Sequence, residues 1–229
     1  MRKRKILIDA GHGFSEKTKR YERPLMFLDE EKNEVKIVPN SMSGTDKDYL
    51  PGYYREDHGT LLIAMETIKV LSDLGYDPYC TRSNRMDSLN HLETVIPNVT
   101  KYQKKVWQEH NWIQAAGEFY KPAAFVSIHT NAGRGEGVSC FYRDEEVGKD
   151  FAKEIASNVK EVMDSNIRRI KLHKYAILRN MAEGLACLIE CGFHDNPKEL
   201  KKLIDPTYQK LIGQSIANAI DNYFRLTSK

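Results

Sequence analysis

The chain has 229 residues, enough for one large domain with a buried core, and we expect a single domain over residues 1–229, although two small domains would also fit this length. Lys and Arg (35) only slightly outnumber Asp and Glu (32), so the net charge of +3 does not indicate nucleic acid as a partner. No apolar run approaches the roughly 20 residues of a membrane helix, and we expect no integral membrane segment. The basic residues 1–5 precede only a short apolar run, so we also expect no signal peptide.

Short apolar runs alternate with segments of helical periodicity along the chain. In chain order they predict a strand at residues 4–9, a helix at 61–74, a strand at 76–81, a helix at 104–120, strands at 123–129 and 137–142, a helix at 146–163, a strand at 185–190, and a helix at 208–224 that is entered through Pro206. Strands that alternate with helices are typical of α/β proteins. We therefore expect a three-layer α/β/α fold with a mostly parallel, twisted central sheet.

Two polar segments interrupt this alternation, near residues 14–52 and 83–106, and we expect both to be insertions. The first contains two short apolar runs, at residues 23–28 and 34–38, separated by a charged turn, which predicts a hairpin over the site. The second predicts either a lid or rim of the site or a plain surface excursion. No internal repeat or flexible linker is visible, so we expect no appended binding module.

Side chains that commonly bind metals border apolar segments at three separate places. His12 follows the first predicted strand, Glu56 precedes the first predicted helix, and His129 ends the third predicted strand. In open α/β sheets ligands gather beyond the carboxyl ends of the strands, which predicts one common site. Two histidines and one carboxylate suffice for catalytic zinc, because three protein ligands leave the fourth position open. Asp57 and His58 compete with Glu56 for the ligand role, since spacing excludes neither.

Each of these three residues also has a plainer explanation when it is taken alone. His12 lies in a Gly-rich turn and His129 at an ordinary strand end, where a histidine often has no ligand role. Glu56 stands near a helix start, where a carboxylate interacts favourably with the helix dipole. It is the combination of the three that indicates a metal site.

Glu190 ends the apolar run at residues 185–189. A carboxylate in such a place is costly unless it is paired, hydrogen-bonded or used in chemistry. We interpret Glu190 as a catalytic general base that takes a proton from water and returns it to a leaving nitrogen. The alternative is a structural carboxylate that caps a neighbour or pairs with Lys171, Lys174 or Arg179.

The remaining histidines and the cysteines are given structural interpretations. Cys187 and Cys191 are spaced like a metal pair, but no second pair accompanies them, so we interpret them, with Cys80 and Cys140, as buried thiols. The other histidines lack a partner at a matching spacing, and we expect surface or capping roles for them. They are His58, His91, His110, His173 and His194.

Taken together, the motifs resemble those of the zinc-dependent N-acetylmuramoyl-L-alanine amidases of the amidase-3 type. The resemblance rests on Asp9-Ala-Gly-His12-Gly13, on Glu56 before the first long helix, on Ser127-Ile-His129-Thr-Asn131-Ala132, and on Ile189-Glu190-Cys-Gly192-Phe193 with Asn196-Pro197. It covers most of the chain except roughly residues 14–52 and 83–106. The stretch between His12 and Glu56 is longer than the usual connection in that family.

The resemblance implies a zinc-dependent hydrolase that cleaves the amide between N-acetylmuramic acid and L-alanine in peptidoglycan. It implies that His12, Glu56 and His129 hold Zn²⁺ and that Glu190 is the catalytic residue. We expect a phage endolysin that stays in the host cytoplasm before lysis and then acts on the cell wall. The alternative in the same class is a wall amidase that is released when a sporulating mother cell lyses.

Two alternatives come from other functional classes. A zinc peptidase of the carboxypeptidase kind also uses His, Glu, His and a catalytic Glu, but it needs an Arg for the substrate carboxylate that we cannot assign. A non-catalytic wall-binding protein would require a lost ligand or base, whereas all four residues are present. We therefore expect an enzyme.

Overall fold

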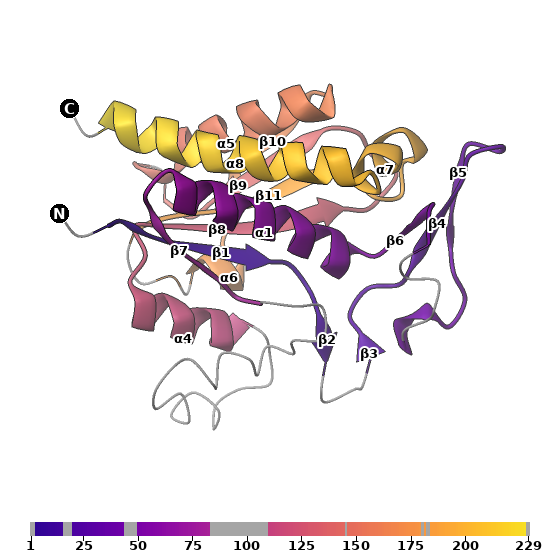
Figure 1. Ribbon diagram of the computed structural model, residues 1–229, viewed down its shortest axis with the longest axis horizontal. Coiled ribbons are helices and arrows are strands. Elements are labelled where there is room, and N and C mark those ends of the chain that lie inside the picture. The colour runs from indigo at the N-terminus through magenta and orange to yellow at the C-terminus, as the bar shows by residue number, and fades with distance from the viewer. Residues whose placement is uncertain are drawn as a thin grey trace.

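A computed structural model describes residues 3–15, 20–43, 50–82, 110–144, 146–179, 181 and 184–227 of the chain. Its centre is a sheet of six strands (Figure 1). In spatial order these are β10 (Ile167–Leu172), β9 (Val138–Tyr142), β11 (Leu185–Phe193), β8 (Ala124–Asn131), β1 (Lys5–Ala10) and β7 (Asp77–Cys80). Every neighbouring pair is parallel except β9 and β11. The predicted mostly parallel sheet is confirmed.

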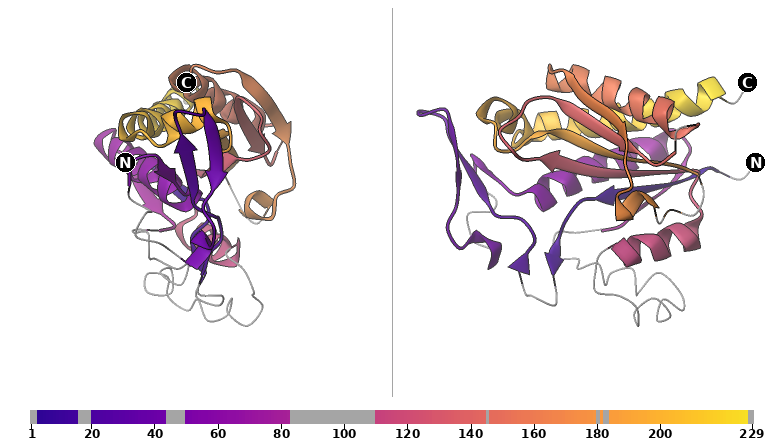
Figure 2. Two further views of the ribbon diagram at one scale, coloured as in Figure 1. Left: turned by 90° about the vertical axis from the view of Figure 1, so that its right-hand side faces the viewer. Right: turned by 180° about the vertical axis from the view of Figure 1, so that it is seen from behind.

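Helices cover both faces of the sheet (Figures 1 and 2). One face carries α1 (Glu56–Asp73), α5 (Gly148–Met163) and α8 (Pro206–Thr227), and the other carries α4 (His110–Tyr120) and α6 (Ala176–Arg179). Successive side chains of a strand point to opposite faces. Ile6 and Ile8 of β1 accordingly lie in the core beneath α1, α5 and α8, whereas Leu7 lies in the core beneath α4 and α6. The expected three-layer α/β/α fold is confirmed.

The first helix begins earlier than the periodicity predicts. It starts at Glu56 rather than at residue 61, after Arg55 in an extended conformation. Glu56 and Asp57 supply acidic groups to the first turn, where the helix dipole stabilises negative charge. The apolar pattern begins only at Leu61, so periodicity missed the polar first turn.

Several described elements were not predicted, among them β10, α6 and the short helix α7 (Pro197–Leu203). Strand β10 is an edge strand that pairs only with β9, and its three basic residues Arg168, Arg169 and Lys171 are exposed. Edge strands need less apolar sequence because one side faces solvent, which explains the weak signal. Of the predicted helix at 104–120, residues 104–109 lie outside the described residues.

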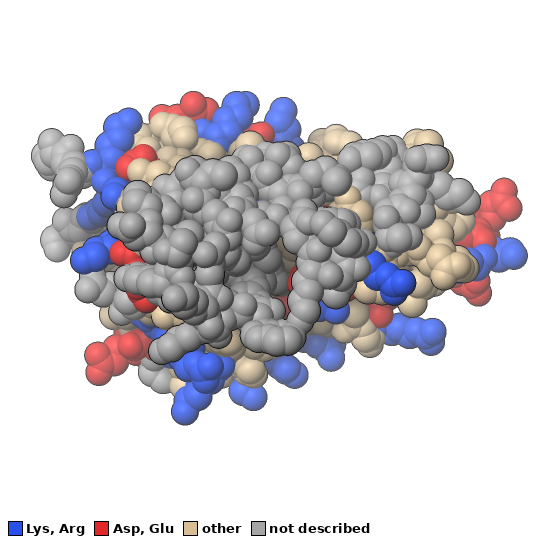
Figure 3. Space-filling view, turned by 90° about the horizontal axis from the view of Figure 1, so that it is seen from below, with Lys and Arg blue, Asp and Glu red and all other residues tan. Residues whose placement is uncertain are grey.

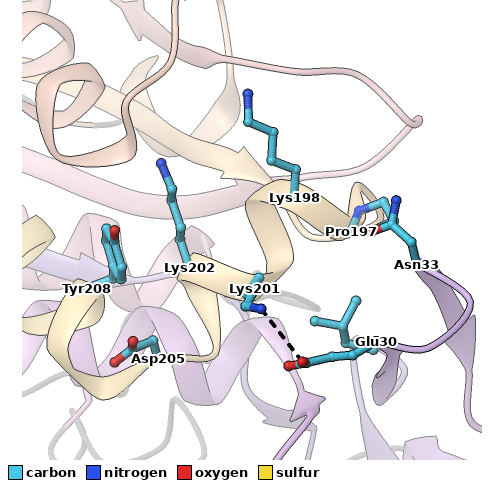
Figure 4. Close-up of a pocket in the computed structure, with 9 residues that line it drawn as sticks. Glu30, Asn33, Pro197, Lys198, Lys201, Lys202, Asp205 and Tyr208 are labelled. Carbon is cyan, nitrogen blue, oxygen red and sulfur yellow. Dashed lines mark ion pairs between the residues drawn. The ribbon is translucent and has the colours of Figure 1, made fainter.

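The predicted hairpin in the first insertion is present. Strands β4 (Met26–Asp29) and β5 (Glu34–Ile37) pair antiparallel, and β6 (Tyr53–Tyr54) joins the other side of β4. The hairpin extends from one end of the molecule (Figure 1), and its Glu30 lies 3.6 Å from Lys201 of α7 (Figure 4). It packs on α7, whereas the chain just before it reaches the candidate site. The second predicted insertion, at 83–106, lies outside the described residues.

Charges of both signs are distributed over the surface. On the face shown in Figure 3, the described Lys and Arg side chains lie interspersed with Asp and Glu side chains, in keeping with the small net charge of +3. Within the described part of the chain, no helix combines the length and the apolar character needed to cross a membrane.

Candidate metal centre

Three potential metal ligands meet at one edge of the central sheet. His12 follows the end of β1 by two residues, His129 lies near the end of β8, and Glu56 is the first residue of α1. Strands β1 and β8 are adjacent and parallel, so their carboxyl ends lie side by side. The predicted position beyond the strand ends is therefore what the structure shows.

The spacing of these side chains suits a tetrahedral ion. One ligand atom from each of His12, Glu56 and His129 lies within 4.8 Å of the other two. Oε2 of Glu56 is 3.5 Å from Nε2 of His12, and Oε1 is 3.3 Å from Nδ1 of His129. Tetrahedral zinc with bonds of about 2.0–2.1 Å separates its ligands by about 3.3 Å. Two imidazoles and a carboxylate at these distances fit zinc.

The neighbouring histidines stabilise the ionised form of the buried Glu56 carboxylate. Burial acts to raise its pKa, but the hydrogen bond with His129 and the nearby His12 lower the pKa to about 2. Burial acts to lower the pKa of His129, but its contact with Glu56 raises that pKa to about 9. The backbone N–H of Thr130 also donates to Glu56 Oε1 at 2.9 Å. The carboxylate of Glu56 therefore carries a negative charge that attracts a cation, and in the metal-free protein this cation is the protonated His129.

Buried polar side chains tie the surrounding elements together below the centre. Asp9 of β1 accepts a hydrogen bond of 2.6 Å from the hydroxyl of Ser127 in β8. Arg82, which is fully buried, donates to the carbonyl oxygens of Ala10 and Asp57 at 3.0 and 2.9 Å. These bonds connect the end of β1 to β8 and to the first turn of α1. The ligand positions therefore rest on a rigid base.

Gly11 and His12 have different local roles at the end of β1. His12 itself adopts the left-handed conformation, with φ at 62°. A Cβ atom on Gly11 would lie 2.4 Å from the ring of His129, closer than two atoms can approach. Gly11 therefore makes room for His129, and the turn itself is made at His12.

Glu190 lies beside the three ligands, on β11. It is in register with His129 of the adjacent parallel strand β8. Its Oε2 atom is buried and has no hydrogen-bond partner among the described residues. Burial raises the pKa of Glu190 to about 7, although the nearby His129 acts to lower it. A carboxyl group that can hold and release a proton near neutral pH is suited to general acid–base catalysis.

The ion pairs considered for Glu190 and the residues that compete with Glu56 as ligands are not found in these roles among the described residues. No ion pair joins Glu190 to Lys171, Lys174 or Arg179, all of which are described. Asp57 is fully buried 3.8 Å from Arg55 and is outside the ligand cluster. His58 is outside it as well. Glu56 is the carboxylate that the fold brings to both histidines.

The cysteines are thiols away from the ligand cluster. All four are free, and Cys140, Cys187 and Cys191 are buried. None belongs to the metal-ligand group found among the described residues. The interpretation of Cys187 and Cys191 as buried thiols agrees with this arrangement.

Sequence reasoning missed five residues that surround the ligands. Glu22 and Arg23, from the first insertion, each contact His12. Tyr54 and Thr130 share a hydrogen bond of 3.2 Å, and Thr130 contacts His194 at 2.9 Å. The surface or capping role expected for His194 is wrong, because its side chain is buried in this chain of polar contacts. No spacing in the sequence indicates that Tyr54, Thr130 and His194 meet, since they come from different segments of the chain.

Comparison with known proteins identifies the family. The family model described as N-acetylmuramoyl-L-alanine amidase matches residues 6–222, which is most of the chain. The chain belongs to this amidase family. The matched range includes all three potential ligands and Glu190.

Individual members of the amidase family agree with this assignment. A Buchnera aphidicola protein named for the same activity is 35% identical over 79 residues, which span 34% of this chain and only 36% of that protein. The CwlD amidase of Clostridioides difficile, solved with the GerS lipoprotein, is 25% identical, with a TM-score of 0.68 over 97% of this chain and 99% of that one. An N-acetylmuramoyl-L-alanine amidase of Clostridium difficile 630 is 20% identical, with a TM-score of 0.66 over 99% and 100%, and shows the same fold.

Proposed function

We propose that this member of the amidase family is a zinc-dependent N-acetylmuramoyl-L-alanine amidase. Its substrate would be the amide between the lactyl group of N-acetylmuramic acid and the L-alanine of the peptidoglycan stem. The observation that carries the proposal is the cluster of His12, Glu56 and His129 with the partly buried Glu190 beside it, within the matched family range.

In this proposal His12, Glu56 and His129 hold the zinc ion. When bound, zinc polarises the scissile carbonyl group and makes a nearby water more acidic. Thr130 supports the arrangement, because its backbone N–H occupies one lone pair of Glu56 Oε1. Arg82 and Asp9 hold the strand ends in place beneath the ligands. The protein thus supplies a preorganised set of donors.

Glu190 moves the proton in this mechanism. Its carboxylate takes a proton from the attacking water, and Glu190 then returns that proton to the nitrogen of the leaving L-alanine. Because burial raises its pKa to about 7, the acid form is stable enough to exist between these two steps. Such general acid–base catalysis typically contributes about 10²–10⁴-fold to the rate.

Digestion of purified peptidoglycan tests the proposal. New N-terminal alanine and new reducing sugar ends are assayed in parallel, with a chelator and after zinc is restored. We expect alanine termini alone, lost on chelation and recovered with zinc. Release of free amino acids in place of alanine termini would instead favour a carboxypeptidase-like peptidase, and retention on wall material without any new amino groups would favour a binding protein.

Glu190→Gln separates catalysis from metal binding. We expect this variant to bind zinc with unchanged stoichiometry and to lose activity by at least about 10²-fold, because the amide cannot take a proton. The matched control is Glu34→Gln, since Glu34 lies in β5 and its side chain is 61% exposed. Wild-type activity in Glu190→Gln would remove Glu190 from the mechanism.

The biological setting stays a prediction. A phage endolysin in the host cytoplasm and a wall amidase of a sporulating cell would share the same chemistry. Adding the purified protein to intact cells distinguishes the two settings, because an endolysin of this kind is expected to lyse cells whose wall it can reach. Activity on purified wall without lysis of any intact cells would favour the wall-amidase setting.

A further inference from the structure

The insertion between His12 and Glu56 reaches the metal centre through two consecutive residues. Glu22 Oε2 lies 3.1 Å from Nδ1 of His12, and Arg23 Nε lies 3.1 Å from Nε2 of the same ring. Both ring nitrogens of His12 are therefore in contact with this one segment. The motif that resembles the family contains neither residue, since both lie in the long stretch between His12 and Glu56.

These two contacts determine which nitrogen of His12 carries the proton. A guanidinium group only donates hydrogen bonds. Arg23 Nε–H must therefore donate to Nε2 of His12, which then carries the lone pair. The ring proton must be on Nδ1, from which it is donated to the carboxylate of Glu22. In the metal-free protein the lone pair of Nε2 accepts from Arg23, whose Nε also lies 3.4 Å from Glu56 Oε2. A metal ion would take the place of this guanidinium group, because Nε2 lies 3.5 Å from Glu56 Oε2 and in this tautomer carries no proton.

The position of Glu22 is supported by the local backbone. Its N–H donates to the carbonyl oxygen of Gly13 at 3.1 Å. The neighbouring Tyr21 pairs with Phe14 in the two-stranded sheet of β2 (Phe14–Ser15) and β3 (Arg20–Tyr21). Tyr21 is buried, with the guanidinium carbon of Arg55 3.9 Å from its ring centre. A small sheet thus holds Glu22 against the turn that carries His12.

We propose that Glu22 is a positioning residue of the metal centre. It holds His12 in the Nδ1–H tautomer, fixes the plane of the ring and directs Nε2 toward the ion. A carboxylate that accepts the second N–H of a ligating histidine also makes that histidine a stronger ligand. The inference rests on the zinc centre of the proposed function, and it assigns a role in metal binding to the insertion.

Zinc affinity is the first test. Dissociation constants are measured by chelator competition, without peptidoglycan, for the wild type, Glu22→Gln, Glu22→Ala and the control Glu34→Gln. We expect both Glu22 variants to bind zinc about 10–100-fold more weakly, which is the usual effect of losing such a partner. Glu34→Gln should bind like the wild type. Unchanged affinity in both Glu22 variants would overturn the proposal.

The tautomer of His12 gives a second readout that does not depend on zinc or on activity. Nitrogen NMR of the metal-free protein, labelled in histidine, reports which ring nitrogen carries the proton. We expect the proton on Nδ1 in the wild type and a mixture of tautomers in Glu22→Ala. A proton on Nε2 in the wild type would overturn the proposal even if zinc binds.

The same measurements distinguish failure of this inference from failure of the proposed function. If the wild type binds no zinc, the proposed function fails, and the NMR result alone decides whether Glu22 sets the tautomer. If zinc binds but peptidoglycan is not cleaved, the affinity ratio still decides the role of Glu22. Unfolding curves with chelator present show that each variant is folded, because Glu22 is partly exposed and its loss should not disturb the core.

Discussion

The side chain of Glu190 shows how one partly buried carboxyl group couples protonation to stability. In the metal-free folded protein, burial raises its pKa to about 7, whereas in the unfolded chain the group titrates at its usual value. Between these two values the folded state binds more protons than the unfolded state. Stability from this group is therefore fully present below the usual carboxyl pKa and is lost as the pH rises through about 7.

Glu190→Gln should remove this dependence, because an amide does not titrate. With a chelator present, we compare the free energy of unfolding of the variant with that of the wild type. The difference in favour of the variant should increase by on the order of 2–3 kcal/mol as the pH rises from about 5 to about 8. Urea unfolding at several pH values measures this difference. Parallel pH profiles for the two proteins would show that the Glu190 carboxyl group is not desolvated as the structure has it. The control Glu34→Gln should follow the wild type throughout.

The close approach of helices α1 and α8 depends on Gly213. A Cβ atom at Gly213 would lie 2.7 Å from the carbonyl oxygen of Ile63 and 2.8 Å from Cβ of Glu66. The hydroxyl of Thr67 also bonds the carbonyl oxygen of Gly213 at 3.1 Å. The two helices therefore touch through backbone atoms, and they cover the sheet beside the ligand positions.

Gly213→Val should force these helices apart. We expect the free energy of unfolding to fall by about 1–3 kcal/mol, the usual cost of overpacking a core contact. Urea unfolding checks this value. The control is Leu211→Ala on the same helix, where the side chain is 42% exposed and the change should stay within about 0.5 kcal/mol. A midpoint in Gly213→Val equal to that of the wild type would contradict the close packing.

The β4–β5 hairpin contributes to the stability of the protein in a different way from the helices. Its ion pair between Glu30 and Lys201 is exposed on both sides (Figure 4), and exposed pairs contribute about 0–1 kcal/mol. The hairpin is therefore held to α7 weakly at this point. The part of the insertion that matters to the metal centre is the stretch before it, where Glu22 and Arg23 contact His12.

Zinc should stabilise the molecule as a whole, because the unfolded chain does not hold the three ligands together. At a free zinc concentration about 100 times the dissociation constant, binding adds about 2.7 kcal/mol. For a chain of this size this corresponds to a rise in Tm of roughly 5–10 °C. Thermal unfolding with zinc and with a chelator measures the shift.

A matched variant shows whether this stabilisation comes from the proposed centre. Glu56→Gln removes the negative charge between the two histidines, so its Tm should respond little to zinc. Glu34→Gln should keep the full response. Equal Tm values for the wild type with zinc and with a chelator would argue against a metal ion bound at His12, Glu56 and His129.

The amino-acid sequence by itself determined the fold class and the ligand candidates. Apolar runs that alternate with helical periodicity are local properties, and they placed His12 and His129 at strand ends and Glu56 near a helix start. Parallel strands with helical crossovers bring such ends to one edge of the sheet. Local pattern therefore sufficed to predict that these residues meet.

Tertiary structure alone decided the surroundings of the site. Strands β9 and β10 run opposite to the other strands of the central sheet, Thr130 pairs with His194, and Glu22 and Arg23 contact His12. Each of these features depends on elements that are separate in the sequence. Such contacts depend on sheet order and on the path of the insertion, which no periodicity encodes. Burial likewise raises the pKa of Glu190 only once β11 lies between β8 and β9, because desolvation is a property of the packed molecule.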